Sequence, residues 1–376
     1  MISEFLLPVS IELRAFSAQL DTFSIGSSLR FDEEIQEKSI VIFGIKESRG
    51  GGSDYNSEID FDFVRRQFYQ LKKGNWHLPI YDLGDLNAGS ELEDTYFAAL
   101  KIQEELLKKK CTLLILGGTS DFAYWQYRAF DSVTHTVNLT SIDNRFRLGN
   151  DISELSSENY LSKIITKEPQ QLFDYTHLGH QTYFVAQEEL DLMEHLNFEV
   201  KRLGKLTESI SEAEPELRNS NLVVMNLDAV QYSDFRSNKE SSANGFNSRE
   251  ICALARYSGR NNKTQSFGVY NYKAKNILVD DMLLAEILWY FIEGKNYAPE
   301  KLEFKGEEGY ETYYVQMKEQ DLIFYHDVNA QQWWMELSSA DEKNRQYVIP
   351  CSFKDYETAL SGQIPNRWWK SYKKLY

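Results

Sequence analysis

The 376-residue sequence contains no apolar run close to the roughly 20 residues that a membrane-spanning helix needs, so no membrane span is expected. Its start carries Glu4, Glu12 and Arg14 within the apolar pattern, unlike the basic-then-apolar layout of a signal peptide. Cysteine is scarce, and Cys111, Cys252 and Cys351 are scattered without metal-like spacing. These absences predict a cytoplasmic protein with reduced, inert thiols.

Positive charge is also in short supply. The chain has 41 Lys and Arg against 57 Asp and Glu, a formal net charge of −16, and its basic clusters at 108–110 and 370–374 are short. Because an acidic surface repels phosphate backbones, no nucleic-acid partner is expected, and no membrane partner is expected either. Aromatic residues, in contrast, are frequent at 14% and prominent after Trp289.

Apolar runs of strand length alternate with amphipathic stretches of helix length. Strands are predicted at residues 39–43, 78–81, 112–116, 134–142, 172–178, 198–203, 222–227 and 264–272. Helices are predicted at residues 61–71, 91–109, 122–130, 187–196, 249–257 and 279–293. This alternation favours an α/β fold, a three-layer α/β/α sandwich around a mostly parallel sheet of roughly eight strands.

Three polar segments follow or overlap apolar runs of this pattern. They are Gly-Gly-Thr-Ser-Asp at 117–121, Ser-Ile-Asp-Asn-Arg-Phe-Arg at 141–147, and Asn-Leu-Asp-Ala-Val at 226–230. Each lies where a buried parallel strand would end. Open α/β sheets place their sites at these carboxyl ends, so we expect the three segments to form one site.

In order and spacing the three segments resemble the ureohydrolases, the family of arginase, agmatinase and formimidoylglutamase. The corresponding family motifs are Gly-Gly-Asp-His-Ser, Asp-Ala-His-x-Asp and Ser-x-Asp-x-Asp. Weaker matches at 45–52, 63–66, 177–181, 248–250 and 285–290 extend the resemblance over residues 38–294. It implies an arginase-like domain at 38–295, preceded by a segment at 1–37 and followed by a β-rich, aromatic extension at 296–376.

The resemblance implies two Mn ions that share a hydroxide, which attacks a guanidino or formimino carbon. The six family ligands fall on Ser120, Asp143, Arg145, Arg147, Asp228 and Val230. Only Asp143 and Asp228 are ligand types of the right kind, and two carboxylates are too few to hold two ions. We therefore expect no metal cofactor, or Mn at Asp143 and Asp228 if the site still binds one.

The two arginines in these positions suggest what replaced the metals. A guanidinium group stays protonated, repels cations and forms bidentate pairs with carboxylates. On an extended strand Asp143, Arg145 and Arg147 would project to the same side. We therefore predict an ion pair between Arg145 or Arg147 and Asp143 or Asp228, and destabilisation on loss of Arg145. The alternative is a collapsed cleft with both arginines turned to solvent.

Other polar residues near the predicted strand ends are candidates for ligand binding: His177, His180 and Asn271. The two histidines could complete a metal set with Asp143 and Asp228, although hydrogen-bonded histidines are favoured. Asn271 lies in a strand where the family carries a substrate-binding Glu, so a cationic substrate would lose its partner. Asp121 is expected to cap the helix that starts at Phe122.

The sequence thus favours a pseudoenzyme that acts by binding or assembly. One alternative is an active hydrolase of a linear amidine (formimidoylglutamate, agmatine or arginine type) with an altered or single-metal site. The other is a hydrolase with a metal-free mechanism in the same cleft. An unknown small molecule or protein is the expected partner, and homo-oligomerisation is expected. We predict that Trp333, Trp334, Trp368 and Trp369 are largely buried against the core or another chain.

Overall fold

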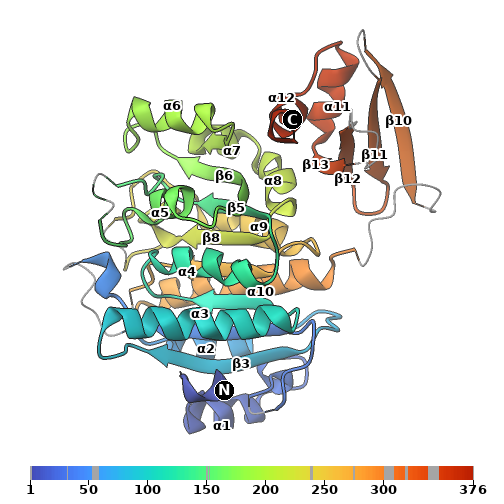
Figure 1. The fold of residues 1–376 in the computed structure, drawn as a ribbon. Coiled ribbons are helices and arrows are strands. Elements are labelled where there is room, and N and C mark those ends of the chain that lie inside the picture. The colour runs from blue at the N-terminus through green and yellow to red at the C-terminus, as the bar shows by residue number, and fades with distance from the viewer. Residues whose placement is uncertain are drawn as a thin grey trace.

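The computed structural model describes residues 2–31, 33–52, 59–149, 151, 153–237, 240–273, 276–299, 309–317, 321–337 and 347–375 (Figure 1). Among these residues, nine strands form one large sheet. Their spatial order is β1 (Leu6–Leu7), β3 (Ile80–Asn87), β2 (Ile40–Lys46), β4 (Thr112–Leu116), β9 (Ser266–Tyr270), β8 (Leu222–Asn226), β5 (Val137–Ile142), β6 (Leu172–His180) and β7 (Glu199–Arg202). Only β1 runs antiparallel to its neighbour, so the predicted mostly parallel sheet is confirmed, with the short β1 as an addition.

Helices cover both faces of this sheet and make the three layers. One apolar cluster joins the sheet to α1 (Ile11–Gln19), α2 (Asp62–Gln70), α7 (Leu203–Glu208), α8 (Glu214–Arg218), α9 (Ser248–Gly259) and α10 (Leu278–Asn296). A second cluster, on the opposite face, joins it to α3 (Leu92–Lys108), α4 (Phe122–Arg128), α5 (Tyr160–Thr166) and α6 (Gln187–His195). The central strands β4, β8 and β9 are buried along their whole length, as their continuous apolar runs require.

A smaller antiparallel sheet follows α10, in the order β10 (Tyr310–Gln316), β11 (Asp321–Asp327), β12 (Gln332–Leu337) and β13 (Tyr347–Cys351). Two helices, α11 (Phe353–Leu360) and α12 (Asn366–Leu375), complete this part of the chain, which Figure 1 shows beside α8. Trp334 and Trp368 are 1% and 2% exposed, and Trp333 is also buried. Trp369 is 45% exposed in the single chain, so it is not buried against the core, and its burial against another chain stays a prediction.

Polar contacts attach this C-terminal part to the core. Arg367 Nη1 lies 2.7 Å from the Glu216 carboxylate, and Lys370 Nζ lies 2.6 Å from that of Glu199. Arg218 Nη2 donates to the Trp333 carbonyl oxygen at 2.9 Å, and its guanidinium lies over the Trp334 ring. The C-terminal part therefore packs on the core.

No helix in the described ranges combines the length and the apolar character needed to cross a membrane. The three cysteines are free and buried.

Candidate functional site

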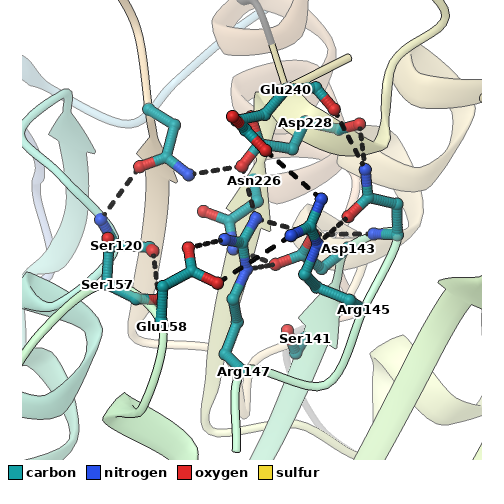
Figure 2. Close-up of polar contacts among 12 residues, drawn as sticks. Ser120, Ser141, Asp143, Arg145, Arg147, Ser157, Glu158, Asn226, Asp228 and Glu240 are labelled. Carbon is teal, nitrogen blue, oxygen red and sulfur yellow. Dashed lines mark hydrogen bonds and ion pairs between the residues drawn. The ribbon is translucent and has the colours of Figure 1, made fainter. Parts of the chain in front are cut away.

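The three polar segments meet at the carboxyl edge of the large sheet. The strands that precede them, β4, β5 and β8, lie within one run of neighbours, β4-β9-β8-β5. Ser120 follows β4, Asp143 follows β5, and Asp228 lies in a short 3-10 turn (Leu227–Ala229) after β8. Figure 2 shows their side chains directed toward one shared space. The predicted convergence is therefore present.

Arg147 fills the space between the two aspartates. Its Nε lies 2.8 Å from Asp143 Oδ2, and its Nη2 pairs with Asp228 Oδ2 (Figure 2). All three side chains are inaccessible to solvent. Burial alone would lower the pKa of Arg147, but the carboxylates of Asp143 and Asp228 hold it well above its usual value. The predicted ion pair is confirmed for Arg147.

The backbone conformation of the segment that carries Asp143 and Arg147 differs from the predicted extended strand. β5 ends at Ile142, so the segment after it is not an extended strand, and alternation does not align its side chains. Arg147 itself has φ +58, a left-handed conformation that is uncommon for a residue with a side chain. This turn brings the Arg147 side chain back over Asp143, four residues earlier in the chain.

Arg145 does not pair with the two aspartates, so Arg147 alone makes the predicted ion pair. Its Nη2 lies 3.3 Å from the Glu240 carboxylate and its Nη1 lies 3.9 Å from that of Glu158. The guanidinium also lies 5.0 Å from the centre of the Phe184 ring, and a quarter of the side chain is exposed. Arg145 therefore forms an outer, solvent-accessible layer over the buried Arg147.

Further residues complete the hydrogen bonding of the inner cluster. Glu158 Oε1 lies 2.6 Å from Arg147 Nη1, and the Asn226 amide donates to Asp143. The Asn271 amide nitrogen donates to Asp228 Oδ2 at 2.7 Å, while its oxygen accepts from the Ser120 backbone N–H at 3.0 Å. Both aspartates therefore have cationic and amide partners inside the protein, which is what buried carboxylates require.

The remaining family positions have structural roles. The Ser120 hydroxyl donates to the Ser157 carbonyl oxygen at 3.1 Å, and Val230 lies fully buried in an apolar cluster. Asp121 does not cap α4 with its side chain, so that expectation is wrong. Its carboxylate is buried and accepts from the Tyr96 hydroxyl at 2.6 Å, and burial raises its pKa to about 6.

The two candidate histidines are buried under the same site. His177 has Nε2 3.0 Å from the Asp143 carbonyl oxygen and Nδ1 2.9 Å from the Tyr175 hydroxyl. Burial lowers the pKa of His177 well below its usual value and that of His180 to about 4, so both rings are neutral. Both ring nitrogens of His177 make hydrogen bonds. His177 is therefore a hydrogen-bonded histidine, which the sequence analysis favoured over a metal ligand.

The residues present do not fit the pair of Mn ions that the resemblance implies. The guanidinium of Arg147 occupies the space between Asp143 and Asp228, where a cation would have to bind. In the part of the chain that the structure describes, no group of three or more His, Cys, Asp and Glu residues could hold a metal ion. The alternative set of His177, His180, Asp143 and Asp228 is therefore not assembled.

Sequence reasoning missed four members of this cluster: Ser157, Glu158, Asn226 and Glu240. Asn226 lies inside the third polar segment, at the last position of β8, and could have been found there. The other three come from connections between elements. Their approach depends on loop conformation, for which the sequence carries no periodic signal.

Several solved structures of ureohydrolases share this fold with the chain. Trypanosoma cruzi formiminoglutamase with Mn2+ aligns at a TM-score of 0.61 and 15% identity, over 70% of this chain and 95% of that one. Bacillus subtilis formimidoylglutamase aligns at 0.63 and 14% identity, over 72% and 90%. Proclavaminate amidino hydrolase from Streptomyces clavuligerus aligns at 0.60 and 15% identity, over 71% and 95%.

No family model matches the sequence, and no curated protein matches it. At this level of identity the structural likeness establishes the fold. The chain therefore has the arginase-like α/β fold that the motif order predicts, with a separate antiparallel sheet at its C-terminal end.

Proposed function

We propose that this protein is a non-catalytic member of the ureohydrolase fold that acts by binding or assembly. The observation that carries the proposal is the buried guanidinium of Arg147 between Asp143 and Asp228. Arginine is not deprotonated in proteins, so this positive charge is permanent. It supplies the neutralisation that a metal ion would supply, but it offers no site at which a water could be bound and activated.

The charges around Arg147 support this interpretation. An active two-metal site keeps carboxylates free to coordinate cations, whereas here Asp143 and Asp228 are occupied by Arg147 and by the amides of Asn226 and Asn271. Freeing the two carboxylates for a metal ion would leave the buried charge of Arg147 without its partners, at a cost on the order of 3–5 kcal/mol. A cation would have to offset that cost before it could bind.

Restoring the ligand types tests the proposal directly. After dialysis against Mn, the wild-type protein is expected to retain well under about one equivalent per chain, because its ligand set is too small. The variant Ser120→His/Arg145→His/Arg147→Asp/Val230→Asp restores four ligand types and is expected to gain Mn. Arg145→His alone, which leaves Arg147 in place, is the matched control. Elemental analysis measures the metal, and melting curves verify folding.

Activity assays distinguish the rival function. Wild-type protein with and without Mn is offered formimidoylglutamate, agmatine and arginine, and release of the nitrogenous product is measured. No turnover is expected. Two equivalents of Mn bound at Asp143 and Asp228 in the wild-type protein would instead establish a hydrolase with an altered site. Turnover by the wild-type protein at a rate that differs in Arg147→Met would establish the same.

Self-association through the C-terminal part is the assembly that we propose. Leu360 on α11 and Trp369 on α12 are 60% and 45% exposed, and large exposed apolar side chains are common anchors of interfaces. The double variant Leu360→Ser/Trp369→Ser is expected to lower the mass measured by light scattering. Leu278→Ser removes a leucine of similar exposure on α10 and serves as the control. An unchanged mass in the double variant would contradict this assembly.

A further inference from the structure

A cavity of about 570 Å³ opens at the amino edge of the large sheet, opposite the cluster around Arg147. It lies where β2, β4 and β9 begin and α10 ends. Its polar lining comprises Lys38, His77, Lys110, Thr112, Asn262, Gln265 and Lys295. Among the described residues that line it, none is acidic. The lining is therefore basic, whereas the chain as a whole has a net charge of −16.

The sheet register places two of these lysines side by side. Ile40 of β2 pairs with Thr112 of β4 in a parallel ladder, so Lys38 and Lys110 each lie two residues before the pair. Both have left-handed backbones, with φ +59 and +57. The Lys38 N–H bonds the carbonyl oxygen of Lys109 at 3.4 Å, which holds the two strand entries together. The fold therefore keeps the backbones of Lys38 and Lys110 adjacent at the edge of the cavity.

Lys295 places a third cation inside the protein. It is 9% exposed, lies in the last turn of α10, and donates to the carbonyl oxygens of Asn261 at 2.9 Å and Thr264 at 2.7 Å. Across the described ranges it has no carboxylate partner, and an ammonium group has a third N–H to donate. Burial lowers the pKa of Lys295 to about 7, since nothing negative offsets the desolvation.

We propose that this cavity binds a small molecule with several negative charges, carried by phosphate or carboxylate groups. Lysine binds such oxyanions as a point charge, and the amides of Asn262 and Gln265 provide additional hydrogen bonds. The volume lies within the range of about 300–1,000 Å³ that is typical of small-molecule sites. The bound anion supplies the counter-charge that Lys295 lacks. This site is independent of the carboxyl-edge cluster and of the loss of metal chemistry there.

Titration calorimetry on the full chain tests the site. Pyrophosphate and citrate are the probes, each measured at an ionic strength matched with sodium chloride. The probe with the higher affinity identifies phosphate or carboxylate as the preferred group. Saturable binding of one probe per chain is expected. If both probes produce no more heat than the matched chloride, the proposal is overturned.

Two exposed lysines provide the decisive variant. Lys38→Gln/Lys110→Gln is expected to weaken probe binding by at least about tenfold, because two charges that face the anion are lost. Lys108→Gln removes an exposed lysine that does not line the cavity, and it should leave affinity unchanged. A double variant that binds within about twofold of the wild type would overturn the site.

Lys295→Met separates ligand binding from a structural role. If Lys295 serves only to hold the Asn261 and Thr264 carbonyls, the folded variant would bind the probe like the wild type. The proposal expects the folded variant to lose binding. If Lys295→Met does not fold, Lys38→Gln/Lys110→Gln decides the question, because both of its positions are exposed.

Discussion

The two edges of the large sheet each hold a buried cation, but the two cations differ in whether carboxylates neutralise them. At the carboxyl edge, Arg147 is enclosed by Asp143, Asp228 and Glu158, so its charge is satisfied within the protein. At the amino edge, Lys295 has two backbone carbonyls as partners and a cavity beside it. A site that satisfies its own charges has little to offer a ligand, whereas one with an excess of charge selects a partner of opposite sign.

The pKa values of the two cations express this difference. Although burial lowers both, the carboxylates around Arg147 raise its pKa well above the usual value. The pKa of Lys295 falls to about 7, because carbonyl dipoles compensate less than full negative charges do. The resemblance to ureohydrolases directs attention to the carboxyl edge, where the three polar segments lie. The cation without a carboxylate partner among the described residues lies at the amino edge.

The largest effect is expected from breaking the balanced edge. Arg147→Met keeps much of the side-chain volume but leaves Asp143 and Asp228 buried without their cation. We expect the free energy of unfolding, measured with denaturant, to fall by about 3–5 kcal/mol. Arg147→Met/Asp143→Asn/Asp228→Asn removes the stranded charges too and should recover part of this loss. A loss below about 1 kcal/mol in Arg147→Met would show that the cluster is solvated and poorly formed.

A smaller effect is expected at the unbalanced edge, and it depends on pH. The folded pKa of Lys295 is about 7 against 10.5 in the unfolded chain, so the unfolded state binds more protons between these values. The free energy of unfolding should therefore rise with pH across this window, by less than the roughly 5 kcal/mol to which the full difference between the two pKa values corresponds. His77, Lys38 and Lys110 face the same cavity, so we compare each curve with that of Lys295→Met.

The comparison with Lys295→Met isolates the contribution of this lysine. The variant should lack the additional rise between pH 7 and pH 10 that the wild type shows. Parallel curves for the two proteins would mean that Lys295 titrates near its ordinary value and that the amino edge is not short of negative charge.

The sequence was most informative where apolar runs are continuous. The strand predicted at 112–116 is β4, residue for residue, and the three polar segments meet at one sheet edge as strand order requires. Short helices such as α5, α7 and α8 were missed, because five to seven residues hold too little periodicity to detect. The cavity beside Lys295 was also missed, since it forms only when the end of α10 reaches the strand entries.

At the candidate site, the residue types could be interpreted from the sequence, but the positions of the side chains could not. Residue types predicted an arginine paired with Asp143 or Asp228, and Arg147 makes that pair with both. Strand alternation wrongly assigned Arg145 an equal part, because the chain leaves the sheet at Ile142. Once the strand ends, the approach of Glu158 and Glu240 is set by loop backbone, which residue spacing does not specify.

The smallest effect is expected from Arg145, which provides the matched control for Arg147. Sequence reasoning assigned it a large cost on removal, but its partners Glu158 and Glu240 are 54% and 38% exposed. Pairs in such surroundings contribute about 0–1 kcal/mol and are weakened by salt, so Arg145→Ala should lower the free energy of unfolding by less than about 1 kcal/mol. Repeating the denaturant curves in high salt should shrink the difference from wild type further. If Arg145→Ala instead costs as much as Arg147→Met, both arginines belong to one buried network, and the separation of an inner from an outer layer is wrong.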